Sequence, residues 1–298
     1  MEQAIRSFLL AAVLLGPSGL ALSQPPLPGL TDWPCPRAEP DPAADARRNA
    51  MAERVLTPTP PEEFFKSAAQ AQAQAPASDA EQRRIQELLA RDWPNLCRYK
   101  AANAALGVTR PKVVLMGDSI TEGWVRGDPA LFMDGVVGRG IGGQTSPQML
   151  VRFRQDVVAL QPRVVHIMAG TNDIAGNTGP VTVQDFRNNI LAMIDLARAN
   201  GIAVILAGIP PSQRLYWRGE LDPRPLIHEL NAWLRAMAEE QGLVFVDYGA
   251  VLADAGGGLR ADLGNDGVHP NRAGYAAMRP LAERAIAGAI ERGSASPR

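Results

Sequence analysis

The sequence of 298 residues has almost no net charge, few histidines and cysteines, and no long apolar run. Its 30 basic and 31 acidic residues nearly cancel, which excludes the strongly basic surface that binds nucleic acid. Without an apolar stretch of about 20 residues, we expect neither a membrane-spanning helix nor a stable membrane anchor. The three histidines and two cysteines form no Cys-x-x-Cys or His-x-x-x-His pair, which argues against a metal site.

The N-terminus has the pattern of an export signal. A short polar start ends at Arg6, residues 8–15 are apolar, and Ala21-Leu22-Ser23 offers small residues for cleavage. Glycine, proline and serine interrupt the apolar stretch from residue 16, so it is too short to span a bilayer. We expect a signal peptide over residues 1–23 and a periplasmic or secreted mature protein. The alternative is an uncleaved apolar tail.

The two cysteines are Cys35 and Cys97. In an oxidising compartment they can form a disulfide that ties the N-terminal segment to the region before the main domain. Two unpaired buried thiols are the alternative. Neither cysteine lies near the motifs described below, so we expect no catalytic role for either.

Composition separates an N-terminal extension, residues 24–110, from a main domain, residues 111–298. Proline is frequent over residues 24–62 and disfavours long helices there, although a short helix is expected over residues 43–56. An alanine- and glutamine-rich patch at residues 68–77 predicts a helix or a linker. The extension is therefore expected to be a mixture of helical and extended segments.

A further helix is expected near the end of the extension. Ser78 and Glu81 fit a capping box, in which each side chain accepts a hydrogen bond from the backbone amide of the other residue. The helix that follows is amphipathic and carries Ile85, Leu88 and Leu89 on one face.

The main domain alternates apolar runs with helical stretches. The runs are typical of buried parallel strands and occupy residues 112–116, 136–137, 163–168, 203–209 and 243–247. The stretches between them carry helix signals such as Thr182, a candidate cap, and Gly242, a candidate stop. This alternation predicts a three-layer, doubly wound α/β/α domain with a parallel five-stranded sheet in the order 2-1-3-4-5.

Gly117-Asp118-Ser119 directly follows the first apolar run of the main domain. A serine at the carboxyl end of a buried strand lies where open α/β sheets place their chemistry. Its hydroxyl needs a neighbouring base to act as a nucleophile. His166 falls inside a predicted strand and His228 inside a predicted helix, which leaves His269 as the candidate base.

Asp266 precedes His269 by three residues. A carboxylate at that spacing can hold the imidazole in one tautomer and stabilise the imidazolium that forms. Alone the spacing is weak, because a turn-capping aspartate beside an unrelated histidine has the same pattern. Together with the serine at a strand end, it predicts a triad of Ser119, His269 and Asp266.

Two other strand ends carry candidate donors for the oxyanion of an acyl-transfer reaction. The glycine loop, residues 138–145, supplies backbone amides, and Asn172 supplies a side-chain amide. Both can converge with the amide of Ser119. Tight turns are the alternative explanation for both segments.

These segments occur in the order of the four blocks of the SGNH (GDSL) hydrolases, which the chain resembles over about residues 112–290. Residues 117–124 resemble the lysophospholipase-like and platelet-activating-factor-acetylhydrolase-like branch, with Ile120 in place of the family's leucine. The resemblance implies a flavodoxin-like fold and a reaction without metal or organic cofactor. It also implies these roles: Ser119 as nucleophile, His269 as base, Asp266 as its orienting carboxylate, and an oxyanion hole of Ser119, Gly143 and Asn172.

Three aromatic residues are candidates for the substrate pocket. Tyr216 and Trp217 lie in the segment 210–218 after a predicted strand, where they can line a pocket or cover an apolar patch. Trp124 follows the serine motif, and a core position is the alternative to substrate stacking there.

We therefore expect a serine esterase that cleaves small carboxylic esters, acetyl esters included, through an acyl-enzyme on Ser119. Small-molecule or carbohydrate esters are the expected substrates. An acyltransferase, lysophospholipase or lipase with the same triad is the alternative, and a non-catalytic module is a more remote one. Residues 138–143 also satisfy a dinucleotide-binding pattern, but they follow the second strand and no acidic residue ends the next one. The sequence leaves the oligomeric state open.

Overall fold

The computed structural model describes residues 35, 41–74, 76 and 78–295. The predicted signal peptide and most of the proline-rich segment after it lie outside the described residues. Residues 38–298 form one compact unit, and the account below concerns that unit. Among its described helices, none is both long and apolar enough to cross a bilayer.

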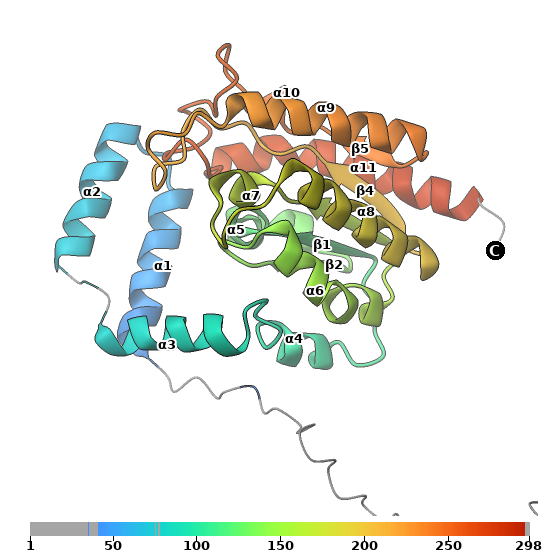
Figure 1. The fold of residues 1–298 in the computed structure, drawn as a ribbon, viewed down its shortest axis with the longest axis horizontal. Helices are drawn as coiled ribbons and strands as arrows, with labels where there is room; N and C mark the ends of the chain where they lie inside the picture. The colour runs from blue at the N-terminus through green and yellow to red at the C-terminus, as the bar shows by residue number, and fades with distance from the viewer. Residues whose placement is uncertain (1–34, 36–40, 75, 77, 296–298) are drawn as a thin grey trace, which may run out of the picture. The chain divides into compact units, whose positions relative to one another are not determined.

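Five parallel strands form a sheet in the order β2-β1-β3-β4-β5 (Figure 1), which confirms the predicted topology. The strands are β1 (Val113–Gly117), β2 (Val136–Gly140), β3 (Val164–Met168), β4 (Ala203–Ala207) and β5 (Val244–Val246). Every residue of β1 and β3 is buried, because helices cover both faces of the sheet and leave no side exposed to water.

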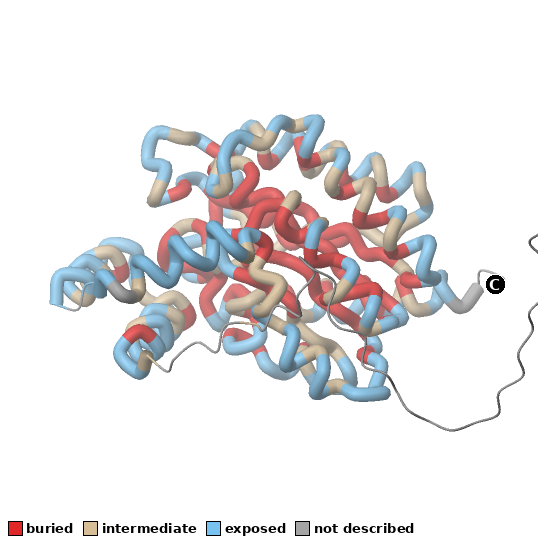
Figure 2. The backbone as a smooth tube through the Cα atoms, turned by 60° about the horizontal axis from the view of Figure 1, so that its bottom comes forward, coloured by how far each residue is buried: buried red, intermediate tan, exposed pale blue. Residues whose placement is uncertain are grey.

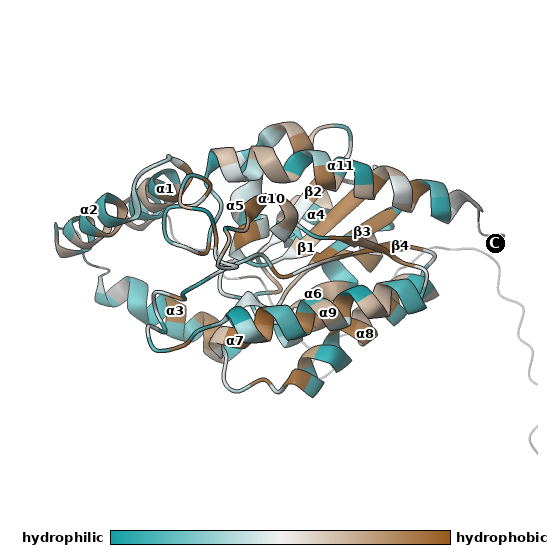
Figure 3. Ribbon diagram, turned by 90° about the horizontal axis from the view of Figure 1, so that it is seen from above, coloured by the Kyte–Doolittle hydropathy of each residue, from teal (hydrophilic) through white to brown (hydrophobic). Residues whose placement is uncertain are grey.

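Helices of the main domain lie on both sides of this sheet, as Figure 3 shows. They are α5 (Ser119–Gly127), α6 (Ser146–Asp156), α7 (Thr171–Ala175), α8 (Val183–Ala199), α9 (Arg224–Glu240), α10 (Gly249–Leu252) and α11 (Arg272–Ala295). Two short 3-10 turns follow α5 and α6, at Pro129–Phe132 and Val158–Leu160. The three-layer α/β/α class predicted from the sequence is confirmed.

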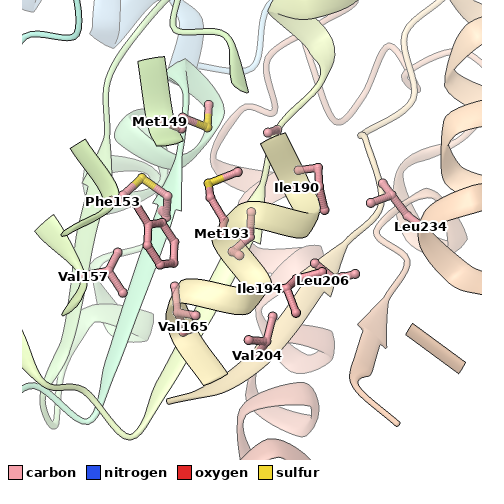
Figure 4. Close-up of a cluster of buried hydrophobic side chains, with 14 of the residues drawn as sticks. Met149, Phe153, Val157, Val165, Ile190, Met193, Ile194, Val204, Leu206 and Leu234 are labelled. Carbon is pink, nitrogen blue, oxygen red and sulfur yellow. The ribbon is translucent and has the colours of Figure 1, made fainter. Parts of the chain in front are cut away.

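Successive strand residues point to opposite faces and feed two separate cores. Val114 and Met116 join the core under α6, α8 and α9, which Figure 4 shows in close-up. Val113 and Leu115 join the core under α5 and α11. In Figure 2 the red, buried segments gather in the interior, and the pale blue, exposed ones lie on the outside. Two apolar layers thus hold the sheet rigid, and the loops at its edge are built on a fixed frame.

The register of the strands decides where the chemistry-bearing residues lie. Gly117 at the end of β1 pairs with Gly140 of β2 on one side and with Met168 of β3 on the other. Because parallel strands that end in register end at one edge, the segments after them emerge together. The serine motif, the glycine loop and the Asn172 segment are those segments.

The described part of the extension is mostly helical. It contributes α1 (Pro42–Leu56), α2 (Pro61–Gln74), α3 (Asp79–Arg91) and α4 (Lys100–Ala105). Leu56 at the end of α1 belongs to the core under α5 and α11, so the extension shares a core with the main domain. The composition of the chain changes at residue 110, but the packing described above continues across that point. That a domain boundary lies there stays a prediction.

The expected helix is present as α3, and its capping box needs correction in detail. Ser78 accepts the Glu81 amide as an N-cap should, but the Glu81 carboxylate pairs with Arg47 of α1 instead of completing the box. Ile85 and Leu89 are 52% and 50% exposed, so the apolar face of the helix is not buried in this unit.

Candidate active site

Ser119 is the first residue of α5 and follows β1 after one intervening residue. Asp118 caps the helix by accepting the Ile120 amide at 2.9 Å. The turn is tight, because a Cβ at Gly117 would lie 2.0 Å from the Thr121 hydroxyl. The Ser119 amide therefore points out of the helix N-terminus, and it donates no hydrogen bond within the part of the chain that is described.

The structure brings together the three side chains predicted to form a triad. The Ser119 Oγ lies 2.8 Å from His269 Nε2, although the two residues are 150 positions apart. His269 Nδ1 lies 2.7 Å from Asp266 Oδ2. The other carboxylate oxygen, Oδ1, accepts the amides of Val268 and His269 at 2.9 and 2.8 Å. Both carboxylate oxygens are therefore held, and the imidazole is fixed between carboxylate and hydroxyl.

Burial and nearby charges shift the pKa of the His269 imidazole. Burial disfavours a charged ring, but the carboxylate and hydrogen bond of Asp266, with a further contribution from Asp118, outweigh it and raise the pKa of His269. Burial likewise works against a charged Asp266, yet His269 and two backbone amides lower its pKa overall. The pair thus stabilises an imidazolium, the species that forms when the ring takes a proton from the serine.

The glycine loop after β2 approaches the serine closely. A Cβ at Gly142 would lie 3.7 Å from the Ser119 Cβ, and the Gly142 amide donates to Glu122 at 2.8 Å. Gly143 has a φ of +77°, a conformation that favours glycine. Its amide makes no hydrogen bond among the described residues, so it remains available to a ligand.

Asn172 lies in α7 and is held from two sides. Its side-chain oxygen Oδ1 accepts the Asn177 side-chain amide at 2.6 Å. Its Nδ2 donates to the Gln144 carbonyl at 3.0 Å and makes a longer bond of 3.3 Å to Asp118 Oδ2. The bond to Asp118 is the longer and weaker of the two.

The residues that hold these loops in place were not predicted from the sequence. Arg152 is fully buried and donates to the Gly117 carbonyl, at 2.9 Å, and to the Gln144 side chain. It also forms an ion pair with Asp156 at 3.1 Å. One guanidinium therefore links the strand end before the serine to the glycine loop. The i, i+4 spacing of Arg152 and Asp156 indicates their ion pair. No sequence pattern predicts the contacts of Arg152 with Gly117 and Gln144.

The three predicted pocket residues lie in different environments. Trp124 is fully buried between the rings of Tyr248 and Tyr275, so it belongs to the core and does not line the site. Tyr216 is 38% exposed, and its ring lies 4.8 Å from that of Trp217. Burial, with the nearby charge of Asp266, raises the pKa of Tyr216 to about 12. Tyr216 and Trp217 thus remain candidates for substrate contact.

The remaining histidines and the cysteines take no part in this arrangement. His166 is buried in β3 and bonds the Tyr248 hydroxyl at 2.9 Å, and burial lowers its pKa to about 4. His228 is on the exposed side of α9. Neither Cys35 nor Cys97 is a free thiol. The bond between the two cysteines stays a prediction.

Comparison with known proteins places the chain in a family. The model of the GDSL-like lipase/acylhydrolase family matches residues 115–277. A protein of Bacteroides fragilis assigned as an acylhydrolase is 44% identical, with a TM-score of 0.64 over 67% of this chain and 99% of its own. A catalytic mutant of the acetylxylan esterase Axe2 from Geobacillus stearothermophilus is 25% identical, with a TM-score of 0.50 over 59% and 94% of the two chains.

A curated relative matches over a shorter segment. An uncharacterized lipoprotein of Bacillus subtilis is 40% identical over 74 residues, which are 24% of this chain and 30% of that protein. The matched segment thus spans less than a third of the relative's length.

The fold is a three-layer α/β/α domain, and the candidate site lies at the carboxyl edge of its parallel sheet. The chain belongs to the GDSL-like lipase/acylhydrolase family, and it is an enzyme of the ester-hydrolase class. The resemblance noted in the sequence is thereby confirmed.

Proposed function

We propose that this protein is an exported serine esterase that hydrolyses small carboxylic esters through an acyl-enzyme on Ser119. The observation that carries the proposal is the contact of 2.8 Å between the Ser119 Oγ and His269 Nε2, with Asp266 bonded to the other ring nitrogen. Hydroxyl, imidazole and carboxylate in that order are the arrangement that activates a serine.

In the first half of the reaction, the Ser119 oxygen attacks the ester carbonyl while His269 Nε2 takes the hydroxyl proton. The negative charge that develops on the carbonyl oxygen meets three donors: the amides of Ser119 and Gly143 and the side chain of Asn172. The N-terminus of α5 adds its positive dipole end. The tetrahedral intermediate collapses, the alcohol leaves with the proton from His269, and an ester of Ser119 remains.

In the second half, His269 takes a proton from water as the water oxygen attacks the Ser119 ester. The same three donors stabilise the second tetrahedral intermediate. The carboxylic acid leaves, and His269 returns the proton to the Ser119 oxygen. Asp266 remains ionised throughout and keeps the ring in one tautomer. Every bond made or broken is accounted for by these residues and water, so the reaction as proposed uses no cofactor.

Small acyl groups are the proposed substrates. Support comes from the likeness to an acetylxylan esterase. Export is proposed from the N-terminal sequence pattern and from the segment shared with a lipoprotein. Hydrolysis is favoured over transfer to another alcohol because water is always present at the acyl-enzyme stage.

The serine is tested by substitution and by chemical labelling. Ser119→Ala should abolish hydrolysis of p-nitrophenyl acetate and leave the far-ultraviolet circular dichroism and the Tm of the protein unchanged. A serine-directed phosphonate should label the wild type at Ser119 in a 1:1 ratio and should not label the variant. Substantial turnover by a folded Ser119→Ala variant would disprove the assignment. A p-nitrophenyl ester series should show kcat/KM falling as the acyl chain lengthens.

A further inference from the structure

The segment 210–218 packs against the segments that carry His269 and Asn172. Leu215 is fully buried and packs with Val268, which lies between Asp266 and His269 in sequence, and with Ala175 at the end of α7. The neighbouring Gln213 accepts the Leu259 amide at 2.9 Å. The two residues that follow Leu215 are therefore held in a fixed position between the histidine segment and the asparagine segment.

Those two residues are Tyr216 and Trp217, and each is tied to the site. The Trp217 indole donates to the Asn177 side-chain oxygen at 2.8 Å, and Asn177 in turn donates to the Asn172 side-chain oxygen. The Tyr216 ring meets the Trp217 ring edge to face, with centroids 4.8 Å apart. Leu215, which directly precedes Tyr216, packs with Val268, which directly precedes His269, so Tyr216 is held beside the histidine segment.

A third aromatic ring joins them from the extension, outside the segment that defines the family. Phe65 of α2 lies edge to face with Tyr216, with centroids 5.9 Å apart. The Arg214 guanidinium lies 5.3 Å from the centre of the Phe65 ring. Phe64, its neighbour, is buried and anchors the helix. The extension therefore meets the main domain beside the site.

A buried side chain fixes that junction. Asn265, adjacent to Asp266, donates to the carbonyls of Val55 and Thr57 at 2.9 and 2.7 Å and accepts the Thr59 amide at 3.2 Å. The chain from α1 into α2 is thus bonded to the segment that carries the histidine. Phe65 stands on a helix with a defined position relative to the reacting atoms.

We propose that Phe65, Tyr216 and Trp217, called here the aromatic strip, bind the alcohol part of the substrate and select alcohols that present a flat apolar ring face, such as a pyranose. His269 must reach the departing oxygen to protonate it, so the alcohol leaves on the side of His269 and Asp266, where Tyr216 lies. Aromatic rings bind flat apolar faces with little loss of side-chain freedom. The proposal rests on the proposed esterase function, and it makes Phe65 a specificity residue contributed by the extension.

The test compares an acetyl ester of a ring alcohol, methyl tri-O-acetyl-xylopyranoside, with ethyl acetate, whose alcohol has no ring. Phe65→Ala should raise KM for the xyloside about 3- to 10-fold with kcat nearly unchanged, the size expected for one lost aromatic contact. Hydrolysis of ethyl acetate should keep its kcat/KM within about twofold, because an alcohol without a ring makes little use of the contact. Phe65→Tyr should behave as the wild type, and Phe65→Leu, which keeps most of the volume, should resemble the alanine variant.

Glu63→Ala is the matched control, because Glu63 is exposed on the same helix. It should leave both substrates unaffected. Equal losses on both substrates, or no loss on the xyloside, would overturn the proposal, and the leucine variant decides the matter if the alanine variant does not fold. The Ser119→Ala variant distinguishes failure of this proposal from failure of the esterase proposal. If that variant retains turnover, the esterase proposal itself is wrong, whatever the Phe65 variants show.

Discussion

At the scale of single residues, the chemistry depends on how three buried ionisable groups share charge. Asp118 and Asp266 both act on His269, but they are held differently. Asp266 accepts three hydrogen bonds and its pKa is lowered, whereas burial raises the pKa of Asp118 to about 6. Asp266 is therefore the carboxylate that stays charged across the working range, and Asp118 serves mainly as the cap of α5.

This difference predicts the pH dependence of the reaction. His269 must be neutral to accept the serine proton, and its pKa is raised, so kcat/KM should fall as the pH drops, with a midpoint above the ordinary histidine value of 6.5. Asp266→Asn removes the charge and the tautomer control, so turnover should drop by about 10³- to 10⁴-fold. The residual activity should show its midpoint at a lower pH. Steady-state kinetics from pH 5 to 9 on p-nitrophenyl acetate measures both effects, and an unshifted midpoint in the variant would contradict the assignment of Asp266.

At the scale of elements, the main domain was predictable because its signals are local and periodic. Each predicted strand has an observed counterpart, and the observed strand order is the expected one, although the alternation of strands and helices does not determine it. The meeting of the Ser119, glycine-loop and Asn172 segments followed from strand ends that share one edge, whereas His269 was predicted by elimination among three histidines and by the spacing of Asp266. The partners of Asn265 and Phe65 were not predictable, because they join the extension to segments about 150 to 210 positions away. No local pattern encodes such a contact, and a buried asparagine looks in sequence like any loop asparagine.

The bond network of Asn265 yields a prediction for α1. Its side-chain amide satisfies carbonyls of the last turn of α1, which have no partner within the helix. Asn265→Ala leaves these partly buried carbonyls without a donor and should lower the free energy of unfolding by about 1–3 kcal/mol. Chemical denaturation measures the loss. Asn49 also joins α1 to the main domain, through Arg126, but it is exposed, so Asn49→Ala should change stability by less than about 0.5 kcal/mol. Equal losses in the two variants would refute this account.

At the scale of the whole molecule, the two cores on either side of the sheet are not entirely apolar. His166 points from the middle of β3 into the core under α5 and α11, against Tyr248 and near Trp124. Its Nδ1 has no hydrogen-bond partner within the described chain. A charged ring there would have no compensating carboxylate, and so the fold tolerates His166 only in its neutral form.

The cost of charging His166 should appear in the pH dependence of global stability. Burial lowers its pKa in the folded protein to about 4, whereas the unfolded chain binds the proton near 6.5. Stability from this residue is therefore fully present above pH 6.5 and is lost as the pH falls from 6.5 towards 4, by about 3 kcal/mol in total. Asp118 acts in the opposite direction, because its raised pKa of about 6 makes protonation favour the folded state. Asp118 is retained in the His166→Asn variant. The difference in the free energy of unfolding between the wild type and this variant therefore does not contain the contribution of Asp118. The free energy of unfolding of the wild type relative to this variant should decrease between pH 7 and pH 4, and a constant difference over that range would show that His166 does not titrate as a buried neutral group.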